Sequence, residues 1–162
     1  MNVAELVSTF QNGVHPQENK EHTEHFPIAR MAFGKTFILP LSQHLGAPSK
    51  PIVEVGQSVL RGQLIADAGG YVSARLHSPV DGTIVAIGPR RHPRGDLSTC
   101  IEIEADPYSN QKMYGSPKAN PLNMSTDEFV ESIQHSVLVG LGGAAFPTHV
   151  KYKLPEGKTC EH

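Results

Sequence analysis

Between residues 35 and 106, short aliphatic and β-branched runs alternate with glycine turns, and this spacing is the feature that most restricts the fold. After a first run at 36–41, further runs follow at 51–55, 58–60, 63–66, 71–72, 83–87 and 100–104. The turns between them contain Gly56, Gly62, Gly69-Gly70 and Asp81-Gly82. Strands this short, with a turn about every eight residues, are typical of a small barrel or sandwich. We therefore expect an all-β unit over residues 36–106.

The pattern within these runs predicts a shared core. Alternation from Cys100 to Glu104 places Ile101 and Ile103 inward and Cys100 outward. Segments 55–59 and 81–85 each lead through glycine into a strand, which suggests two halves that face one another. The expected buried residues are Val53, Val55, Val59, Leu64, Ile65, Val80, Ile84, Val85, Ile101 and Ile103.

Two segments that flank this unit have little periodicity. Residues 1–35 are expected to form an extended arm that becomes ordered by packing on the rest of the chain. Residues 107–124 contain three prolines and few apolar side chains, and they are expected to form a linker.

A helix is expected after the linker. Ser125 and Glu128 have the spacing of a capping box, and the helix should end near His135. A strand at 137–139 should then lead into a glycine loop, Gly140–Phe146. Because a helix, a strand and a loop cannot close a core alone, we expect residues 125–162 to be the beginning of a further domain. Within it, residues 140–162 are expected to be mobile or poorly packed in this chain.

Charge and composition exclude several classes of function. Sixteen acidic and fourteen basic residues give a net charge of −2, which argues against binding to nucleic acid and against a polybasic membrane anchor. Residues 1–10 lack the features of a secretory signal, and the apolar stretch 137–146 is too short to span a bilayer. Two distant cysteines do not form a disulfide framework. We expect a soluble, cytoplasmic chain.

The segment from Val53 to Ile87 resembles a biotinyl or lipoyl carrier domain, the barrel-sandwich hybrid. The motifs are V-x-V-G-x-x-V-x-x-G-Q-L at 53–64 and S-P-V-D-G-x-I at 78–84. In carriers of this kind a lysine on the hairpin between the two motifs bears the prosthetic group, and Tyr71 stands at the matching position here. No lysine occurs between Lys50 and Lys112. We therefore expect neither biotin nor lipoate.

The glycine loop supports more than one interpretation. Gly140, Gly142 and Ala145 fit the dinucleotide-binding fingerprint, and consecutive backbone N–H groups can bind an anion. Pro147, however, falls where that fingerprint requires an uninterrupted helix, and a buried Gly-Ala turn needs no ligand. The pattern alone does not establish a Rossmann site.

A longer match is more specific. The segment GLGGAAFPTHVKY at 140–152 is similar to the flavin- and NADH-binding segment of the complex I subunit that oxidises NADH, with Leu141 in place of arginine and His149 in place of glycine. Together with NGVHPQENK at 12–20 and the sequence at 39–65, these departures resemble the RnfC family, the C subunits of Rnf electron-transport complexes.

This resemblance implies a function. Members of the family are peripheral subunits on the cytoplasmic face of the inner membrane, in complexes that couple electron transfer between NAD(H) and ferredoxin to ion translocation. It implies FMN and NADH as cofactors, other Rnf subunits including a ferredoxin-like iron-sulfur protein as partners, and two 4Fe-4S clusters bound beyond residue 162. This chain, with Cys100 and Cys160 alone, is expected to be inactive by itself. The alternative is a non-catalytic docking scaffold that lacks the carrier lysine.

By position, the resemblance assigns five cofactor-binding residues. Gly140, Gly142 and Gly143 would lie against FMN or NADH, with their amides near phosphate or ribose oxygens. Phe146 would line the pocket near the ring system, with a core contact as the competing interpretation, and Lys151 would place a positive charge near a phosphate. No catalytic residue is assigned.

Three further groups of residues are weaker candidates. No metal site is assigned to His15, His22 and His25, because imidazoles in an extended arm lack a preformed geometry. The basic turn of Arg90, Arg91, His92 and Arg94 is either a solvated loop or a docking site for an acidic partner. Nothing near Cys100 in the sequence lowers the pKa of its thiol.

Overall fold

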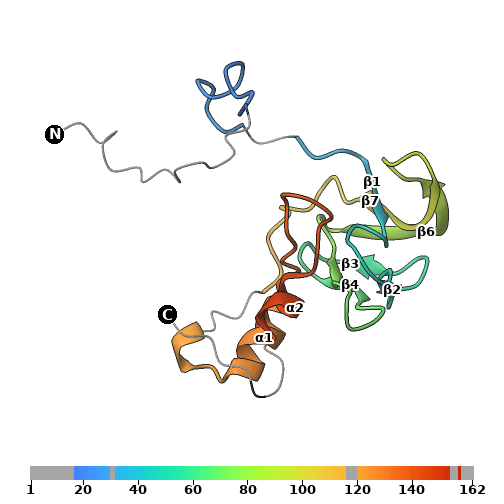
Figure 1. Ribbon diagram of the computed structural model, residues 1–162. Helices are drawn as coiled ribbons and strands as arrows, with labels where there is room; N and C mark the ends of the chain where they lie inside the picture. The colour runs from blue at the N-terminus through green and yellow to red at the C-terminus, as the bar shows by residue number, and fades with distance from the viewer. Residues whose placement is uncertain (1–16, 30–31, 116–119, 154–156, 158–162) are drawn as a thin grey trace. The chain divides into compact units, whose positions relative to one another are not determined.

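The computed structural model describes residues 17–29, 32–115, 120–153 and 157 (Figure 1). The chain forms two compact units, Met1–Ala32 and Phe33–His162. In the first unit the described residues contain a turn, in which the backbone N–H groups of Thr23 and Glu24 each lie 2.8 Å from the carbonyl oxygen of Lys20. The described residues of this segment are exposed, His22 and His25 included.

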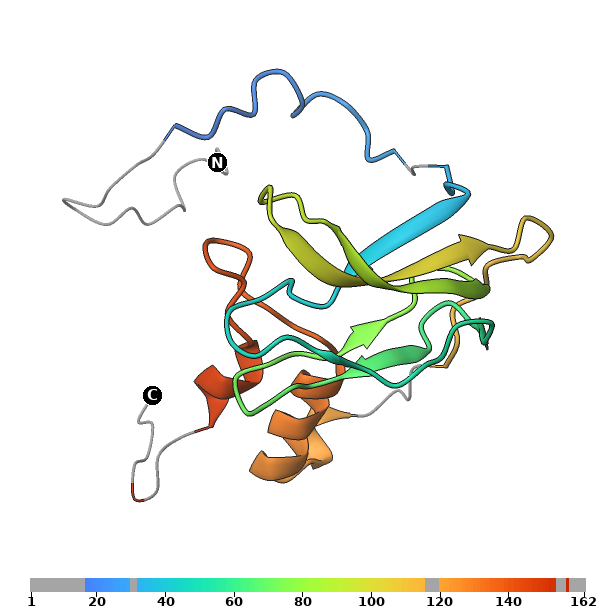
Figure 2. The same ribbon diagram turned by 90° about the vertical axis from the view of Figure 1, so that its right-hand side faces the viewer.

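The second unit contains two antiparallel sheets that face one another (Figure 2). The four-stranded sheet has the order β1-β7-β6-β3; its strands are β1 (Thr36–Pro40), β7 (Leu97–Ala105), β6 (Gly82–Arg91) and β3 (Ser58–Val59). The three-stranded sheet has the order β2-β4-β5; its strands are β2 (Lys50–Pro51), β4 (Leu64–Asp67) and β5 (Leu76–His77). The all-β unit expected from the glycine spacing is confirmed.

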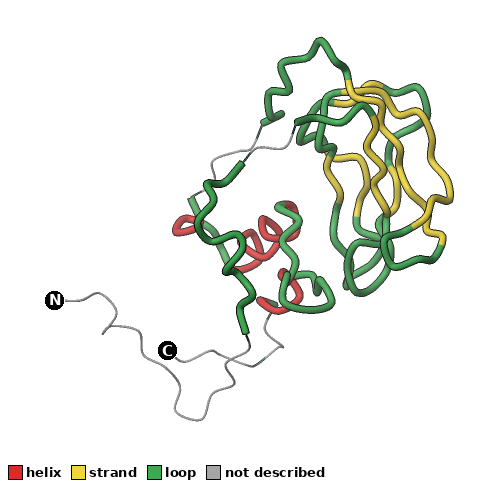
Figure 3. The backbone as a smooth tube through the Cα atoms, turned by 90° about the horizontal axis from the view of Figure 1, so that it is seen from above, coloured by secondary structure: helices red, strands yellow, loops and turns green. Residues whose placement is uncertain are grey.

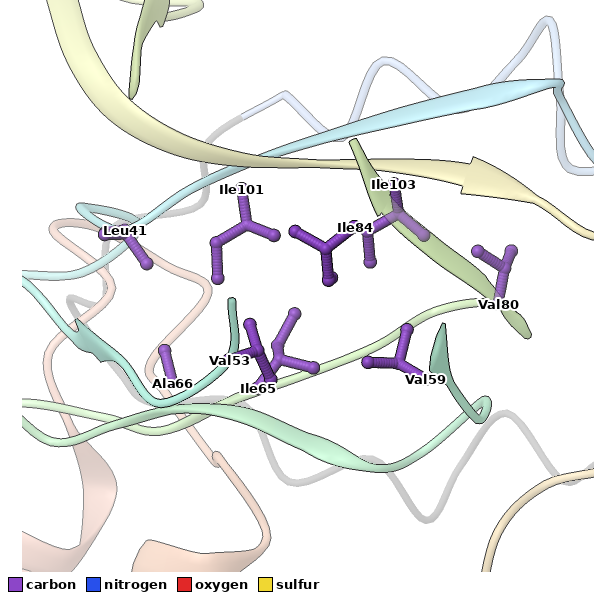
Figure 4. Close-up of a cluster of buried hydrophobic side chains, with 9 residues drawn as sticks. All are labelled: Leu41, Val53, Val59, Ile65, Ala66, Val80, Ile84, Ile101 and Ile103. Carbon is purple, nitrogen blue, oxygen red and sulfur yellow. The ribbon is translucent and has the colours of Figure 1, made fainter. Parts of the chain in front are cut away.

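Buried aliphatic side chains fill the space between the two sheets (Figure 4). Seven of the ten residues predicted for the core are buried there: Val53, Val59, Ile65, Val80, Ile84, Ile101 and Ile103. Leu41 and Ala66, which the prediction omitted, complete the cluster. Leu64 is partly buried, whereas Val55 and Val85 are exposed, so the prediction was wrong for these two valines.

A β-bulge at Val85 changes which residues of β6 face the core. In the pairing of β6 with β7, Ile84 lies opposite Ile103 and Ala86 lies opposite Glu102, which leaves Val85 without a partner. The extra residue reverses the alternation after it. Ile84 and Ile87, although three residues apart, therefore both lie opposite inward-facing isoleucines of β7. The bulge therefore keeps β6 in contact with the core over a longer stretch than strict alternation allows.

Segments 55–59 and 81–85, which the sequence predicted to face one another, pair with each other. Ser58 lies opposite Thr83 and Val59 opposite Gly82, and the N–H of Gly56 donates to the carbonyl of Ile84 at 2.7 Å. Glycine is required at position 82, because an added Cβ would lie 2.2 Å from the carbonyl oxygen of Glu104. The S-P-V-D-G motif thus marks the point where three strands meet.

Asp81, the residue before that glycine, joins three loops. Its carboxylate accepts the N–H of Arg61 at 2.5 Å and the hydroxyl of Ser109, and its own N–H donates to the Gln111 side chain at 2.8 Å. The side chain is 9% exposed. The Ser109 hydrogen bond, the Arg61 N–H and the Arg61 charge lower the pKa of Asp81. The charge of the aspartate in this motif therefore has a structural role.

Two predicted strands are absent from the described residues. Residues 71–72 belong to a loop, because the Val72 carbonyl accepts the N–H of Ala47 at 2.9 Å instead of joining a sheet; the strand forms later, at β5. Residues 137–139 do not form a strand either, because Val137, just after the end of α1, has a φ of 57°. That region forms a single bridge, between Val139 and Pro147.

Two helices follow the sandwich and lie beside its strands (Figure 3), on the side of the three-stranded sheet (Figure 2). A 3-10 turn at Pro121–Asn123 precedes α1 (Thr126–His135). The predicted capping box is present, with Ser125 and Glu128 exchanging hydrogen bonds, and α1 ends where expected. The second helix, α2 (Thr148–Tyr152), packs on α1 through the rings of Phe129 and Tyr152, whose centroids are 5.8 Å apart.

Cys100 is less accessible than its predicted outward position suggested. It lies opposite Pro40 and Gly88, on the face away from the central core, yet it is 1% exposed. Burial raises the pKa of its thiol. Together these effects make Cys100 an unreactive structural residue.

The bulge gives a matched pair of stability variants. Ile103→Ala should lower the free energy of unfolding by about 2–4 kcal/mol, because it leaves a cavity in the core. Val85→Ala should change it by less than about 0.5 kcal/mol, because the side chain faces solvent. Urea denaturation of both variants measures the difference. Equal effects would contradict the outward position of Val85.

Asp81 gives a pH-dependent prediction. Its lowered pKa means that the ionised form stabilises the fold at neutral pH, and this stabilisation is lost as the pH falls through the folded-state pKa, below the ordinary value of 3.8. Asp81→Asn should therefore lower the free energy of unfolding by about 1–3 kcal/mol at pH 7. The gap between the two proteins should narrow at pH 3. A gap that stays constant from pH 7 to pH 3 would contradict a role for the charge.

Candidate functional site

The glycine loop is closed at its base by backbone hydrogen bonds. The N–H of Gly140 donates to the carbonyl of Phe146 at 3.0 Å, and the N–H of Thr148 donates to that of Leu138 at 2.9 Å. Between these bonds, residues 141–144 form an exposed turn. Helix α2 begins directly after Pro147, which is fully buried. The loop is therefore an exposed tip on an anchored base.

The structure brings three of the five predicted site residues together at that base. The Nζ atom of Lys151 lies 5.9 Å from the centroid of the half-buried Phe146 ring. A Cβ added to Gly140 would lie 3.6 Å from the same Nζ atom. A cation, an aromatic ring and a glycine backbone therefore meet at one place.

Gly142 and Gly143 lie at the exposed tip, where nothing in the described chain explains why they are glycine. A Cβ added to either residue would meet no atom within 4 Å, and neither has a positive φ. In the described part of the chain, no hydrogen bond from either backbone N–H is found. The tip therefore presents open backbone and polar N–H groups to an approaching molecule.

The sandwich holds the base of the loop in place. The N–H of Leu45 donates to the carbonyl of Ala144 at 3.1 Å, and the N–H of Ala47 donates to that of Val72 at 2.9 Å. The expectation of poor packing was wrong for residues 145–149, since Pro147 and His149 are buried. The segment packs because loops of the sandwich supply partners that sequence reasoning did not anticipate. Residues 154–156 and 158–162 lie outside the described residues.

His149 is a residue of this site that the sequence prediction did not assign. Its side chain is 4% exposed, and its Nε2 atom lies 3.0 Å from the carbonyl oxygen of Tyr71. The two rings meet edge to face, with centroids 6.1 Å apart. The available signal was its replacement of a glycine in the similar segment, but the partner is 78 residues away in the sequence.

Tyr71, at the position that bears the lysine in carrier domains, belongs to this site too. It lies on the loop between β4 and β5 and is 56% exposed. The Nζ atom of Lys153, at the end of α2, lies 5.6 Å from the centroid of its ring. Whereas a carrier loop must leave its modified residue free to move, this loop packs against α2.

Helix α1 is attached to the sandwich by an electrostatic contact. The Arg75 guanidinium donates to Asp67 at 2.8 Å and to the ring of His135 at the end of α1. The hydrogen bond from Arg75 and the one from the N–H of Ala68 lower the pKa of Asp67. Burial, with the charge of Arg75, lowers the pKa of His77. A cavity of about 170 Å³ lies beside Arg75, between the sandwich and Val137 and Val139.

Docking of an acidic partner by the basic turn stays a prediction, and the structure shows the internal contacts of that turn. Arg90 pairs with Glu102 at 2.7 Å, and Arg94 approaches Asp96 at 3.9 Å, so these two charges in the basic turn have internal partners. The Nε2 atom of His92 donates to the carbonyl of Ser42, in the segment after β1, at 3.1 Å, and its Nδ1 atom accepts the N–H of Arg94 at 3.1 Å. No group of three potential metal ligands is found in the part of the chain that is described, from which His15 and Cys160 are excluded.

Comparison with known families identifies the sandwich. The model of the family described as the RnfC barrel sandwich hybrid domain matches residues 8–108. The chain belongs to the RnfC family. The predicted barrel-sandwich hybrid and the predicted resemblance to this family are both confirmed. The α/β flavin-binding domain expected after the sandwich stays a prediction.

Curated relatives extend the match beyond the sandwich. The chain is 37% identical to the C subunit of the Na⁺-translocating ferredoxin:NAD⁺ oxidoreductase complex of Acetobacterium woodii, over 94% of this chain and 34% of the relative. It is 36% identical to the proton-translocating counterpart of Clostridium ljungdahlii, over 96% and 34%. It is 40% identical to the C subunit of the ion-translocating oxidoreductase complex of Pseudomonas aeruginosa, over 90% and 19%. The chain thus spans about a third or less of the length of these relatives.

These relatives are named as C subunits of oxidoreductase complexes. Within the described residues of this RnfC chain, no helix has both the length and the apolar character needed to cross a bilayer.

The carrier position gives a direct prediction. Because Tyr71 replaces the lysine and no lysine occurs between Lys50 and Lys112, the chain should carry no biotin or lipoate. Intact mass spectrometry after expression in cells that biotinylate and lipoylate proteins measures this. A mass raised by either increment would contradict the prediction.

Proposed function

We propose that this RnfC chain supplies the sandwich platform and the first nucleotide-binding loop of the NADH-facing subunit of an ion-translocating complex. In this proposal the complex transfers electrons between NAD(H) and ferredoxin on the cytoplasmic face of the membrane. The names of the relatives, which specify ferredoxin:NAD⁺ oxidoreductase complexes, support the reaction class.

The observation that carries the proposal is the open glycine tip. Gly142 and Gly143 have neither crowded surroundings nor a left-handed backbone to require them. A side chain at either position would instead extend into the open space beside the loop backbone. Glycines there are explained if a ligand lies against the backbone at this point.

The residues present fit FMN or NADH. Both ligands combine negatively charged phosphate with flat aromatic rings. The tip offers backbone N–H groups to phosphate or ribose oxygens. Exposed Lys151 offers a positive charge, and Phe146 offers a ring face or edge close to that charge. When bound, FMN would supply the chemistry of accepting a hydride and releasing single electrons.

In this arrangement the chain's own residues bind and orient the ligand, and they form no covalent bond with it. The sandwich fixes the loop, the loop contacts the ligand, and Lys151 balances phosphate charge. The 4Fe-4S clusters that would receive electrons need more thiolates than the two cysteines of this chain supply. We therefore assign the clusters to sequence beyond residue 162 and expect this chain alone to be inactive.

A non-catalytic scaffold is the competing function, and the packed Tyr71 loop favours it over a carrier. A scaffold, however, requires no ligand at the glycine loop. Binding of FMN or NADH to a protein that contains this chain therefore separates the two functions.

Gly142→Val tests the assignment. In the full-length subunit that contains this chain, the variant should abolish FMN or NADH binding, because the branched side chain would occupy the space in front of the loop backbone. The sandwich should remain folded, since a Cβ at this position meets nothing. Fluorescence titration with each ligand measures binding, and thermal unfolding measures stability.

Two further titrations complete this test. The 162-residue chain should bind neither ligand detectably. Tyr108→Ala serves as a control, since Tyr108 is 95% exposed and far from the loop in sequence, and it should leave binding unchanged. Unchanged binding by Gly142→Val would remove this loop from the site as proposed. Tight binding by the 162-residue chain would contradict the expectation that sequence beyond residue 162 is needed to complete the site.

A further inference from the structure

The glycine loop is held by a contact between its helix and the loop at the carrier position. His149, on α2, places its Nε2 atom 3.0 Å from the backbone oxygen of Tyr71. A carbonyl oxygen only accepts hydrogen bonds, so Nε2 carries the proton and donates. Because the histidine is 4% exposed, water does not compete freely for this bond. The edge-to-face packing of the two rings adds a second interaction at the same point.

A third segment joins these two. Residues 44–49 connect to the glycine loop through the N–H of Leu45 and to the Tyr71 loop through the N–H of Ala47. The approach is close: Gly46 has a φ of +108°, and an added Cβ would lie 2.0 Å from the carbonyl oxygen of Val72. The glycine loop, the 44–49 segment and the Tyr71 loop therefore form a closed ring of contacts.

The tip depends on this ring for its position. Residues 141–144 are exposed, and Leu141 is 93% exposed, so the tip itself buries little. Its connections to the sandwich are the Ala144 carbonyl on one side and the buried Pro147–His149 base on the other. A loop that makes few contacts of its own has its geometry set by the contacts at its ends.

We propose that His149 and the Tyr71 loop, residues 68–73, form a latch that positions the glycine loop. The loop that presents a prosthetic group in carrier domains here serves as the fixed support for a binding loop. His149 and Tyr71 are positioning residues, which act through the loop and do not touch the ligand. For the identity of that ligand, the inference rests on the proposed function.

Two substitutions of similar size separate the hydrogen bond from the bulk of the side chain. His149→Leu fills the site and removes the donor, whereas His149→Gln retains an N–H donor near the position of Nε2. His25→Leu is the control, since the His25 side chain is 83% exposed in the first unit.

Amide hydrogen exchange, read by NMR on the 162-residue chain, gives a readout that needs no ligand. The N–H of Leu45 reports the attachment of the glycine loop, and the N–H of Ile84, bonded to Gln57 at 2.9 Å, reports the sandwich. His149→Leu should raise exchange at Leu45 at least tenfold and leave Ile84 unchanged. His149→Gln should restore most of the protection, and His25→Leu should change neither amide.

The same experiment can overturn the latch. Equal changes at Leu45 and Ile84 would mean that His149 only stabilises the unit as a whole, and no change at Leu45 would mean that it holds nothing. Should His149→Leu not fold, Tyr71→Ala removes the ring but keeps the carbonyl. That variant should raise exchange at Leu45 several-fold with Ile84 unchanged, and the same two contrary results would reject the latch.

A ligand measurement separates failure of the latch from failure of the proposed function. In the full-length subunit, His149→Leu should raise the Kd for FMN about tenfold, and His149→Gln should return it towards the original value. If FMN binds and neither variant changes the Kd, the latch is rejected and the function stands. If FMN does not bind the original protein, the function is rejected, and the exchange result decides the latch.

Discussion

The pairing of β6 with β7 is the interaction on which the rest of this structure depends. It runs from Gly82 to Arg91 and contains the bulge at Val85. By shifting the alternation, the bulge turns both Ile84 and Ile87 towards the core that the two sheets share. Short strands elsewhere contribute few ladder bonds of their own. Their positions are therefore set by packing on this hairpin and by the side chains that join their loops.

Loops joined in this way connect the core to the proposed site. At one end of the sandwich, Asp81 holds the loops of Arg61 and Ser109 together. Elsewhere in the unit, Ser73 donates to the carbonyl of Ala47 at 2.7 Å and accepts from Gly69 at 2.9 Å, which binds the Tyr71 loop to segment 44–49. Because Ser73 is fully buried, these bonds are protected from water. The glycine loop thus rests on two loops that are themselves fixed.

Local patterns in the sequence were sufficient to predict much of this fold. They did not predict its long-range contacts. The capping box at Ser125 and the glycine turns depend on neighbours within a few residues, so their signals are readable in order along the chain. The bulge at Val85 has no such signal, because an aliphatic residue in a β-rich run reads as core whichever way it points. The predicted strand at 137–139 failed because Val137 adopts a left-handed φ, which a β-branched residue rarely does.

The candidate site shows the same division. Gly140, Phe146 and Lys151 came from one contiguous motif, and the structure places them together. His149 was noticed only as a departure from that motif, because its partner is the backbone of a residue 78 positions away, and a backbone carbonyl leaves no trace in sequence. Tyr71, at the position of the carrier lysine, and His149, at the position of a glycine in the similar segment, thus lie in contact with each other. The loop that bears the modified residue in carrier domains is packed here against a histidine of α2.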